Sequence, residues 1–171
     1  MSSFLCLRPE GAALEVLRNL PRQEHEHIRW EPERRWHLTL RYTAHADERT
    51  VAMLAEVADE VAAAFAPPEV TLGPTTEQLG RDGTLVVPAQ GLDEVAAGVE
   101  EALDGVLGAP SHPFYGHLTL VRLRGKAGLP EGLVGVPIST NFTGTELVLI
   151  ESTPGADGSN YSVLHRATFV G

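Results

Sequence analysis

The chain contains a single cysteine, Cys6, in its 171 residues. One cysteine cannot close a disulfide within the chain and cannot build a cysteine-based zinc site, so both of these means of stabilising a fold are excluded. Cys6 lies in a short apolar run. We therefore expect it to be a buried, small hydrophobic side chain.

Long apolar runs are also lacking, and none approaches the roughly 20 residues that a membrane-spanning helix needs. The apolar start of the chain is only a few residues long and is followed at once by Arg8 and Glu10, so no signal peptide is indicated. With 43% hydrophobic residues the composition is typical of a globular domain. We expect a cytoplasmic protein without a membrane segment, and no obligate protein partner is evident.

Positive charge is scarce, because 13 Lys and Arg stand against 23 Asp and Glu and give a net charge of −10. Binding of nucleic acid through bulk charge is therefore disfavoured. The acidic residues concentrate in residues 47–60 and 93–104, whereas basic residues flank the two His-Leu-Thr-Leu segments described below. This distribution predicts an acidic surface with a basic mouth, that is, a basic rim around a binding site. The alternative is that the basic residues are solvated charges at strand edges. The basic residues in question are Arg34, Arg35, Arg41, Arg122, Arg124 and Lys126.

The tetrapeptide His-Leu-Thr-Leu occurs twice, at residues 37–40 and 117–120. In a β-strand the His and Thr share one face and the leucines share the other. Imidazole exchanges a proton near neutral pH, and a hydroxyl can bond an oxyanion. One copy alone could be a strand histidine with a partner, but two copies predict paired strands that present two imidazoles and two hydroxyls to one phosphate.

The two copies belong to an internal repeat with an offset of 80 residues. Each half reads as strand, helix and motif strand, so we expect one bilobal domain over residues 1–171, with halves of roughly 1–80 and 81–171 and a ligand cleft between them. The offset superposes Leu5 on Leu85, Leu7 on Val87, Gly11 on Gly91 and the first motif on the second.

Hydrophobic periodicity predicts the remaining elements. Helices are expected after Pro9, after the N-cap Asp47, and from Leu92 to Leu107. Residues 81–83 should form a hairpin turn, and residues 125–137 and 152–160 should be loops, the latter mobile. The expected strands are residues 3–7, 25–30, 36–43, 70–72, 77–79, 84–87, 117–123, 145–151 and 161–169.

Two His-x-Thr-x motifs 80 residues apart in a chain of this length resemble the 2H phosphoesterase superfamily, and most closely the bacterial RNA 2′,3′-cyclic phosphodiesterases or 2′-5′ RNA ligase-like proteins. The resemblance implies an α+β fold in which two antiparallel sheets with outer helices are related by a pseudo-two-fold axis, with the active cleft between them. It rests also on residues 4–9, 114–116, Arg122, 151–152 and 161–164.

The resemblance implies hydrolysis of 2′,3′-cyclic phosphates at RNA or nucleotide ends to 2′-phosphates, with possible reverse 2′-5′ ligation and without a cofactor. His37 would then be the proton donor and His117 the proton acceptor; the residues alone do not assign these roles. Thr39 and Thr119 would hold the non-bridging oxygens, whose charge grows in the transition state. Arg122 would add positive charge, but a bend or bulge must first bring it to the face of His117, unless it reaches from the end of the strand.

Aromatic residues near the motifs could stack on a base, or could simply pack. Tyr115 has the same strand parity as His117 and is the preferred candidate, with Phe114 beside it. Tyr42 and Tyr161 are further candidates, whereas the parity of Trp36 favours the core.

The remaining histidines do not indicate a metal site. His25 and His27 resemble a ligand pair but lack a third ligand nearby in sequence. Surface or structural roles are expected for His45, His112 and His165.

Two alternatives remain open. The substrate could be a small cyclic nucleotide or an ADP-ribose cyclic phosphate, which the acidic net charge mildly favours, and residues 41–43 depart from the apolar, glycine-containing continuation expected in the RNA subgroup. The protein could instead bind nucleotides or RNA ends without turnover, although binding alone would not need both histidines.

Overall fold

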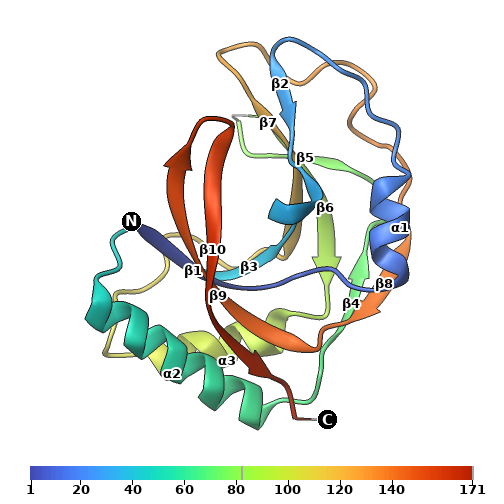
Figure 1. Cartoon of the computed structure of the whole chain (residues 1–171). Helices are drawn as coiled ribbons and strands as arrows, with labels where there is room; N and C mark the ends of the chain where they lie inside the picture. Colours follow the sequence, from blue (N-terminus) through green and yellow to red (C-terminus); the bar gives the residue numbers. More distant parts are fainter. Residues whose placement is uncertain (82, 171) are drawn as a thin grey trace.

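The computed structural model describes residues 1–81 and 83–170, which form two antiparallel sheets and three helices (Figure 1). The first sheet has the order β10-β9-β1-β3, and the second has the order β2-β7-β6-β4-β8, with β5 paired to β6. The strands of the first sheet are β1 (Ser2–Leu7), β3 (Leu38–Thr43), β9 (Glu146–Gly155) and β10 (Gly158–Thr168). Those of the second are β2 (Ile28–Trp30), β4 (Glu69–Leu72), β5 (Glu77–Leu79), β6 (Thr84–Gln90), β7 (His117–Leu123) and β8 (Thr140–Thr143).

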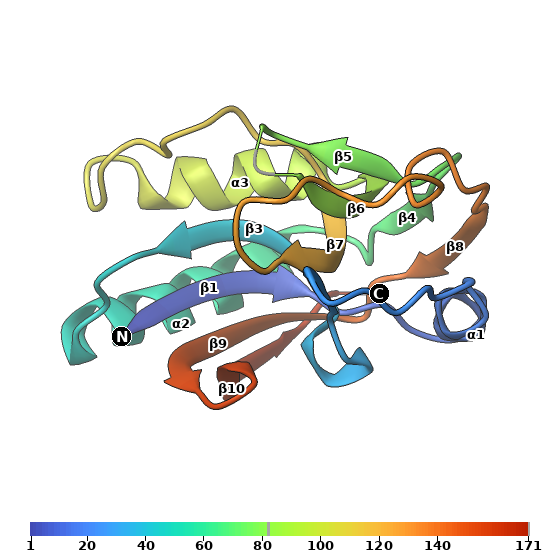
Figure 2. The same cartoon turned by 90° about the horizontal axis from the view of Figure 1, so that it is seen from above.

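Helices cover the outer sides of this arrangement. The helix α2 (Glu48–Ala64) packs on β9 and β10, α3 (Asp93–Leu103) lies against α2 and β3, and α1 (Ala12–Arg18) contacts β8. Seen from above, the motif strands β3 and β7 lie next to each other between the outer elements (Figure 2), and they are in contact. The predicted α+β class with two antiparallel sheets is confirmed. No helix in the described part of the chain is long and apolar enough to cross a membrane.

Local sequence explains why α2 forms where it does. Asp47 caps its first turn, because the backbone N–H of Thr50 donates to Asp47 Oδ1 at 2.8 Å. One face of the helix is apolar at three- and four-residue spacing and is buried against the sheet. The buried residues are Leu54, Val57, Ala58, Val61 and Ala62.

The internal repeat reappears in the strand pairing. β1 pairs with β3 and β6 pairs with β7, and three of the five partner pairs between β1 and β3 recur 80 residues later between β6 and β7. Leu7 opposite Leu38 becomes Val87 opposite Leu118, Cys6 opposite Thr39 becomes Val86 opposite Thr119, and Leu5 opposite Arg41 becomes Leu85 opposite Val121. The two motifs therefore sit in the same position of the same strand pair.

Both motif strands also contain the same register slip. Between Thr39 and Arg41, and again between Thr119 and Val121, two steps on the motif strand face one step on its partner. Each slip is a β-bulge, and a bulge reverses the alternation of side chains beyond it. Leu40 and Arg41 are consequently both buried, as are Leu120 and Val121.

The structure corrects the C-terminal loop prediction. Residues 152–160 are not a mobile loop, because β9 and β10 continue through them to a two-residue turn at Ala156 and Asp157. Two hydrogen bonds from the guanidinium of Arg35 hold this hairpin tip, at 3.0 Å to Asp157 O and 3.1 Å to Ser159 O. A polar composition indicates exposure to solvent, and it does not distinguish a loop from the exposed end of a hairpin.

Three smaller differences concern element boundaries. The first helix begins at Ala12 rather than directly after Pro9, β2 is shorter than expected, and β8 was not predicted. β5 and β6 pair as the predicted hairpin, and Asp82 of its turn lies outside the described residues.

Candidate active site

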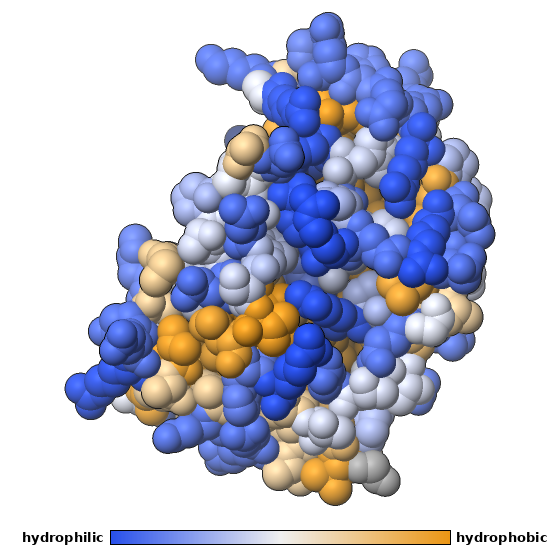
Figure 3. Space-filling model, in the orientation of Figure 1, coloured by the Kyte–Doolittle hydropathy of each residue, from blue (hydrophilic) through white to orange (hydrophobic). Residues whose placement is uncertain are grey.

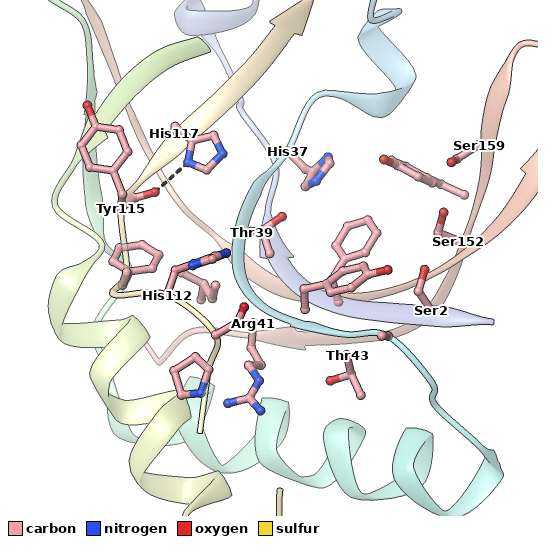
Figure 4. Close-up of a pocket in the computed structure, with 18 of the residues that line it drawn as sticks. Ser2, His37, Thr39, Arg41, Thr43, His112, Tyr115, His117, Ser152 and Ser159 are labelled. Carbon is pink, nitrogen blue, oxygen red and sulfur yellow. Dashed lines mark hydrogen bonds between the residues drawn. The ribbon is translucent and has the colours of Figure 1, made fainter. Parts of the chain in front are cut away.

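A cavity of about 980 Å³ lies beside the two motif strands (Figure 4). Its lining includes His37 and Thr39 from the first motif, His117 from the second, and Arg122. Residues 107–115 form one wall, and Ser152, Ser159 and Tyr161 of the β9–β10 hairpin contribute to another. The molecular face shown in Figure 3 is mostly hydrophilic, with apolar residues gathered over the region of α2 and α3. The cavity is large enough for a nucleotide.

The two motif histidines are oriented in the same way. Nδ1 of His37 is 2.7 Å from the carbonyl oxygen of Arg35, and Nδ1 of His117 is 2.7 Å from that of Tyr115. In each case the carbonyl belongs to the residue two positions earlier. A carbonyl only accepts, so Nδ1–H donates, and in the neutral ring Nε2 carries the free lone pair. Nε2 of each histidine is therefore the nitrogen available to a ligand.

The surroundings of the two histidines differ. The ring of His37 stacks on Phe4 at 4.6 Å between centroids and meets the edge of Tyr161 at 5.5 Å. The ring of His117 lies nearly parallel to Tyr115 at 6.1 Å, and the Tyr115 hydroxyl donates to Glu77 Oε2 at 2.7 Å. His37 is thus enclosed by aromatic rings on two sides.

Enclosure changes the protonation of His37. Burial lowers the pKa of His37 to about 4, and the neighbouring Arg122 and His117 act in the same direction. The hydrogen bond to the Arg35 carbonyl and the negative charge of Glu31 oppose the shift. At neutral pH the imidazole of His37 is therefore uncharged when the cavity holds no anion.

A buried carboxylate, Glu31, organises the basic side of the cavity. Its side chain is 5% exposed, and its Oε2 lies 3.0 Å from Nε of Arg35, which is 4% exposed. Its Oε1 lies 3.2 Å from a terminal nitrogen of Arg29 and 3.2 Å from Nε of Arg122. One negative charge is shared by three positive ones, so the cluster keeps an excess of positive charge that favours an anion.

The predicted phosphate-binding residues are not placed equally. The bulge in β7 brings Arg122 to the cavity, as the parity of the strand required. Both threonines are half-buried, but Thr39 lines the cavity whereas Thr119 lies outside its lining.

The aromatic residues near the motifs fall into two groups, those that line the cavity and one that is buried in the core. Tyr115, Phe114, Tyr42 and Tyr161 line the cavity. Trp36 is buried, and its indole N–H donates to the carbonyl oxygen of Glu31 at 3.1 Å, which accounts for its place in the core.

Arg41 differs from its sequence prediction. It was expected at a basic mouth, but it is buried and donates to Glu100 Oε2 and Gly108 O, both at 2.6 Å. His112 is exposed, in agreement with a surface role, and it also lines the cavity (Figure 4).

Several contributors to the site were missed in the sequence. Glu31 lies two residues before Glu33, and nothing in the local pattern distinguishes the buried carboxylate from the exposed one. Phe4 was recognised only as part of an opening strand. Within residues 1–81 and 83–170, no three His, Cys, Asp or Glu side chains lie close enough together to hold a metal ion. The rings of His25 and His27 are 6.1 Å apart.

The chain is similar to LigT-like phosphoesterases, in sequence over its first half and in fold over nearly all of its length. The family model described as LigT like Phosphoesterase matches residues 7–75, which include the first motif. The predicted resemblance to these proteins is thus confirmed by the family model in the first half of the chain and by the fold over the whole chain. A search of curated proteins finds no match.

Solved structures with this fold cover nearly the whole chain. TT0787 of Thermus thermophilus has a TM-score of 0.83 and 20% identity, covering 99% of this chain and 98% of that chain. E. coli LigT in complex with 3′-AMP has a TM-score of 0.74 and 19% identity, covering 99% and 98%. The MHV ns2 PDE domain has a TM-score of 0.59 and 14% identity, covering 96% and 100%. At these identities the likeness shows a shared fold.

The low pKa of His37 predicts a pH effect on stability. In the unfolded chain a histidine has a pKa of about 6.5, so between pH 6.5 and 4 the unfolded state binds more protons than the folded state. The free energy of unfolding should therefore decrease as the pH falls through this range. Urea denaturation at pH 7 and pH 4.5 should show a smaller decrease in His37→Gln than in the wild type.

The same property can be measured directly by NMR titration of the His37 ring. We expect protonation near pH 4 without ligand and at higher pH with inorganic phosphate, because a nearby anion favours the imidazolium form. A ring that titrates at 6.5 or above in the ligand-free protein would contradict this description of the site.

The arginine cluster predicts that Glu31 is more important for stability than its neighbour Glu33. Glu31→Gln leaves Arg35 buried without its counter-charge, so we expect the free energy of unfolding to fall by about 3 kcal/mol, the range for a broken buried ion pair. The matched control is Glu33→Gln, which removes an exposed ion pair with Arg18 and should change stability little. Equal effects of the two variants in urea denaturation would rule out the special role of Glu31.

Proposed function

We propose that this protein hydrolyses 2′,3′-cyclic phosphates at the ends of RNA or nucleotides to 2′-phosphates by two-histidine general acid–base catalysis. The observation that carries the proposal is the pair His37 and His117, which line one cavity with both Nδ1 atoms engaged by backbone carbonyls. A cyclic phosphate needs proton transfer on both sides of phosphorus. Two ring nitrogens presented to one cavity suit that requirement.

In the proposed reaction His117 Nε2 takes a proton from water as its oxygen attacks phosphorus. The bond from phosphorus to the ribose 3′ oxygen breaks, and that oxygen receives the proton from Nε2 of His37. The phosphate remains on the 2′ oxygen. With a 5′-hydroxyl in place of water as the attacking group, the same steps form a 2′-5′ linkage.

His37 must be protonated to act as the donor, although burial lowers its pKa in the empty cavity to about 4. The negative charge of a bound phosphate would raise that pKa, so the donor would become charged when substrate arrives. Thr39 and Arg122 would stabilise the non-bridging oxygens, where negative charge grows in the transition state. Thr119, which lies outside the lining of the cavity, would contribute less than Thr39.

Two other functions are weighed against this one. Structures of E. coli LigT with 3′-AMP, NADP+ and ATP exist, so a mononucleotide or dinucleotide is a reasonable ligand class for this cavity too. A small cyclic nucleotide or an ADP-ribose cyclic phosphate is accordingly the second candidate substrate. A module that only binds nucleotides is the third candidate, and it gives no reason for the matched orientation of two histidines.

Product analysis tests the proposal. Adenosine 2′,3′-cyclic phosphate should be converted mainly to the 2′-phosphate after exhaustive chelation of divalent metals, because the proton transfers need only the two imidazoles. His37→Ala and His117→Ala should each lower kcat/KM by about a hundredfold to ten-thousandfold, the usual effect of losing one acid or base. Thr39→Ala should cost less.

The control for this experiment is His165→Ala, since His165 pairs with Asp59 at 2.8 Å outside the cavity and its loss should leave the rate unchanged. Mainly 3′-phosphate product, a rate restored by one particular metal, or a nearly fully active His117→Ala enzyme would each overturn the mechanism.

The pH profile gives an independent test. We expect a bell-shaped curve, because the reaction needs one protonated and one neutral imidazole and is lost when both are protonated or both are neutral. The pH at which His37 takes up its proton should be higher in kcat than in kcat/KM, since bound phosphate raises the pKa of His37. The limbs belong to the coupled pair, so the double His→Ala variant should lose less than the product of the single losses. A rate that is flat from pH 3 to 9 would exclude the two-histidine mechanism.

A further inference from the structure

We infer that a second, cationic groove beside the cavity binds another phosphate group of the substrate, one ribose away from the cyclic phosphate. This groove has a volume of about 500 Å³. It is lined by Arg81 and Thr84 around the start of β6, by Arg122 and Leu123 at the end of β7, and by residues 125–128. The inference rests on the proposed function, because it names the part of the substrate that lies outside the catalytic cavity.

Arg122 connects the two sites, since it lines both the cavity and the groove. Its Nε is 3.2 Å from Glu31 Oε1, while 46% of the side chain remains exposed. One edge of the guanidinium is thus fixed by a buried carboxylate, and the terminal nitrogens remain for a ligand. Arg122 is thus a side chain that a ligand could contact from either hollow.

The charge of the groove is opposite to that of the protein. The chain carries −10 overall, yet the groove is lined by Arg81, Arg122 and Lys126. Its described lining includes no carboxylate. Like charges brought together repel one another, and binding an anion relieves that repulsion. Phosphate is the anion that the neighbouring site is already proposed to accept.

The position of the groove suits particular substrates. The terminal ribose of an RNA carries a phosphodiester on its 5′ oxygen as well as the cyclic phosphate, and ADP-ribose cyclic phosphate carries a diphosphate. A nucleoside 2′,3′-cyclic phosphate with a free 5′-hydroxyl has no second phosphate. The groove should therefore discriminate between substrates with and without that group, whichever of the two larger molecules supplies it.

The test compares kcat/KM for four substrates: a nucleoside 2′,3′-cyclic phosphate with a 5′-hydroxyl, the same compound with a 5′-phosphate, a dinucleotide with a cyclic phosphate end, and ADP-ribose cyclic phosphate. The wild type should prefer substrates with a second phosphate by about tenfold, a scale set by two or three solvent-exposed charge contacts. Preference for the dinucleotide identifies an RNA phosphodiester, and preference for the last compound identifies a diphosphate.

The variant Arg81→Gln with Lys126→Gln should abolish this preference and leave kcat/KM for the 5′-hydroxyl compound unchanged. For the dinucleotide, the slope of log Kd against log salt should become shallower by about one. The charge-matched control is Arg49→Gln with Arg166→Gln, two exposed arginines outside both hollows, which should keep the preference. An equal loss on all substrates, or no preference in the wild type, would overturn the inference.

A binding measurement separates this inference from the proposed function. If the wild type hydrolysed none of the four compounds, the proposed function would fail, and the Kd values of a nucleoside 2′-phosphate and of a dinucleotide ending in a 2′-phosphate would still be measurable. Tighter binding of the dinucleotide that the Arg81→Gln, Lys126→Gln variant loses would support the groove. Equal Kd values in the wild type would refute it.

Discussion

The basic side of the cavity depends on one buried carboxylate. Glu31 holds Arg29, Arg35 and Arg122, which come from three separate elements. The guanidinium of Arg35 in turn donates hydrogen bonds to the tip of the β9–β10 hairpin, and the carbonyl oxygen of Arg35 accepts a hydrogen bond from Nδ1–H of His37. Buried charges are tolerated only when they are paired, so none of these groups can move without a penalty to the others. This coupling orients His37 and Arg122 together.

The second constraint is the bulge that both motif strands contain. Without the bulge, Arg122 would lie on the face opposite to His117, because five residues of regular strand reverse the direction of a side chain. With the bulge, two buried residues follow each other and the next side chain returns to the cavity. Tyr42 occupies in β3 the position that Arg122 occupies in β7. The same bulge therefore brings an aromatic ring to the cavity from β3 and a cation from β7.

The sequence was sufficient for what depends on local pattern. Hydrophobic periodicity predicted α2, and alternation predicted the strand that carries the second motif. The matched motifs predicted that two histidines would share a cavity. The sequence was insufficient where long-range contacts decide the outcome. Residues 152–160 are polar but form strands whose tip accepts two hydrogen bonds from Arg35. Glu31 and Glu33 look alike in the sequence although only Glu31 is buried, and Arg41 pairs with Glu100 on a distant helix.

The repeat supplies two chemically identical imidazoles, and the surroundings make them different. Both use Nδ1 to donate to the carbonyl two residues earlier, so the strands alone give them equal orientation. Phe4 and Tyr161 enclose His37, and the resulting loss of hydration lowers its pKa, whereas His117 lies beside the exposed ring of Tyr115. The two copies of the motif therefore lie in unequal environments, and the inequality comes from residues outside the motifs.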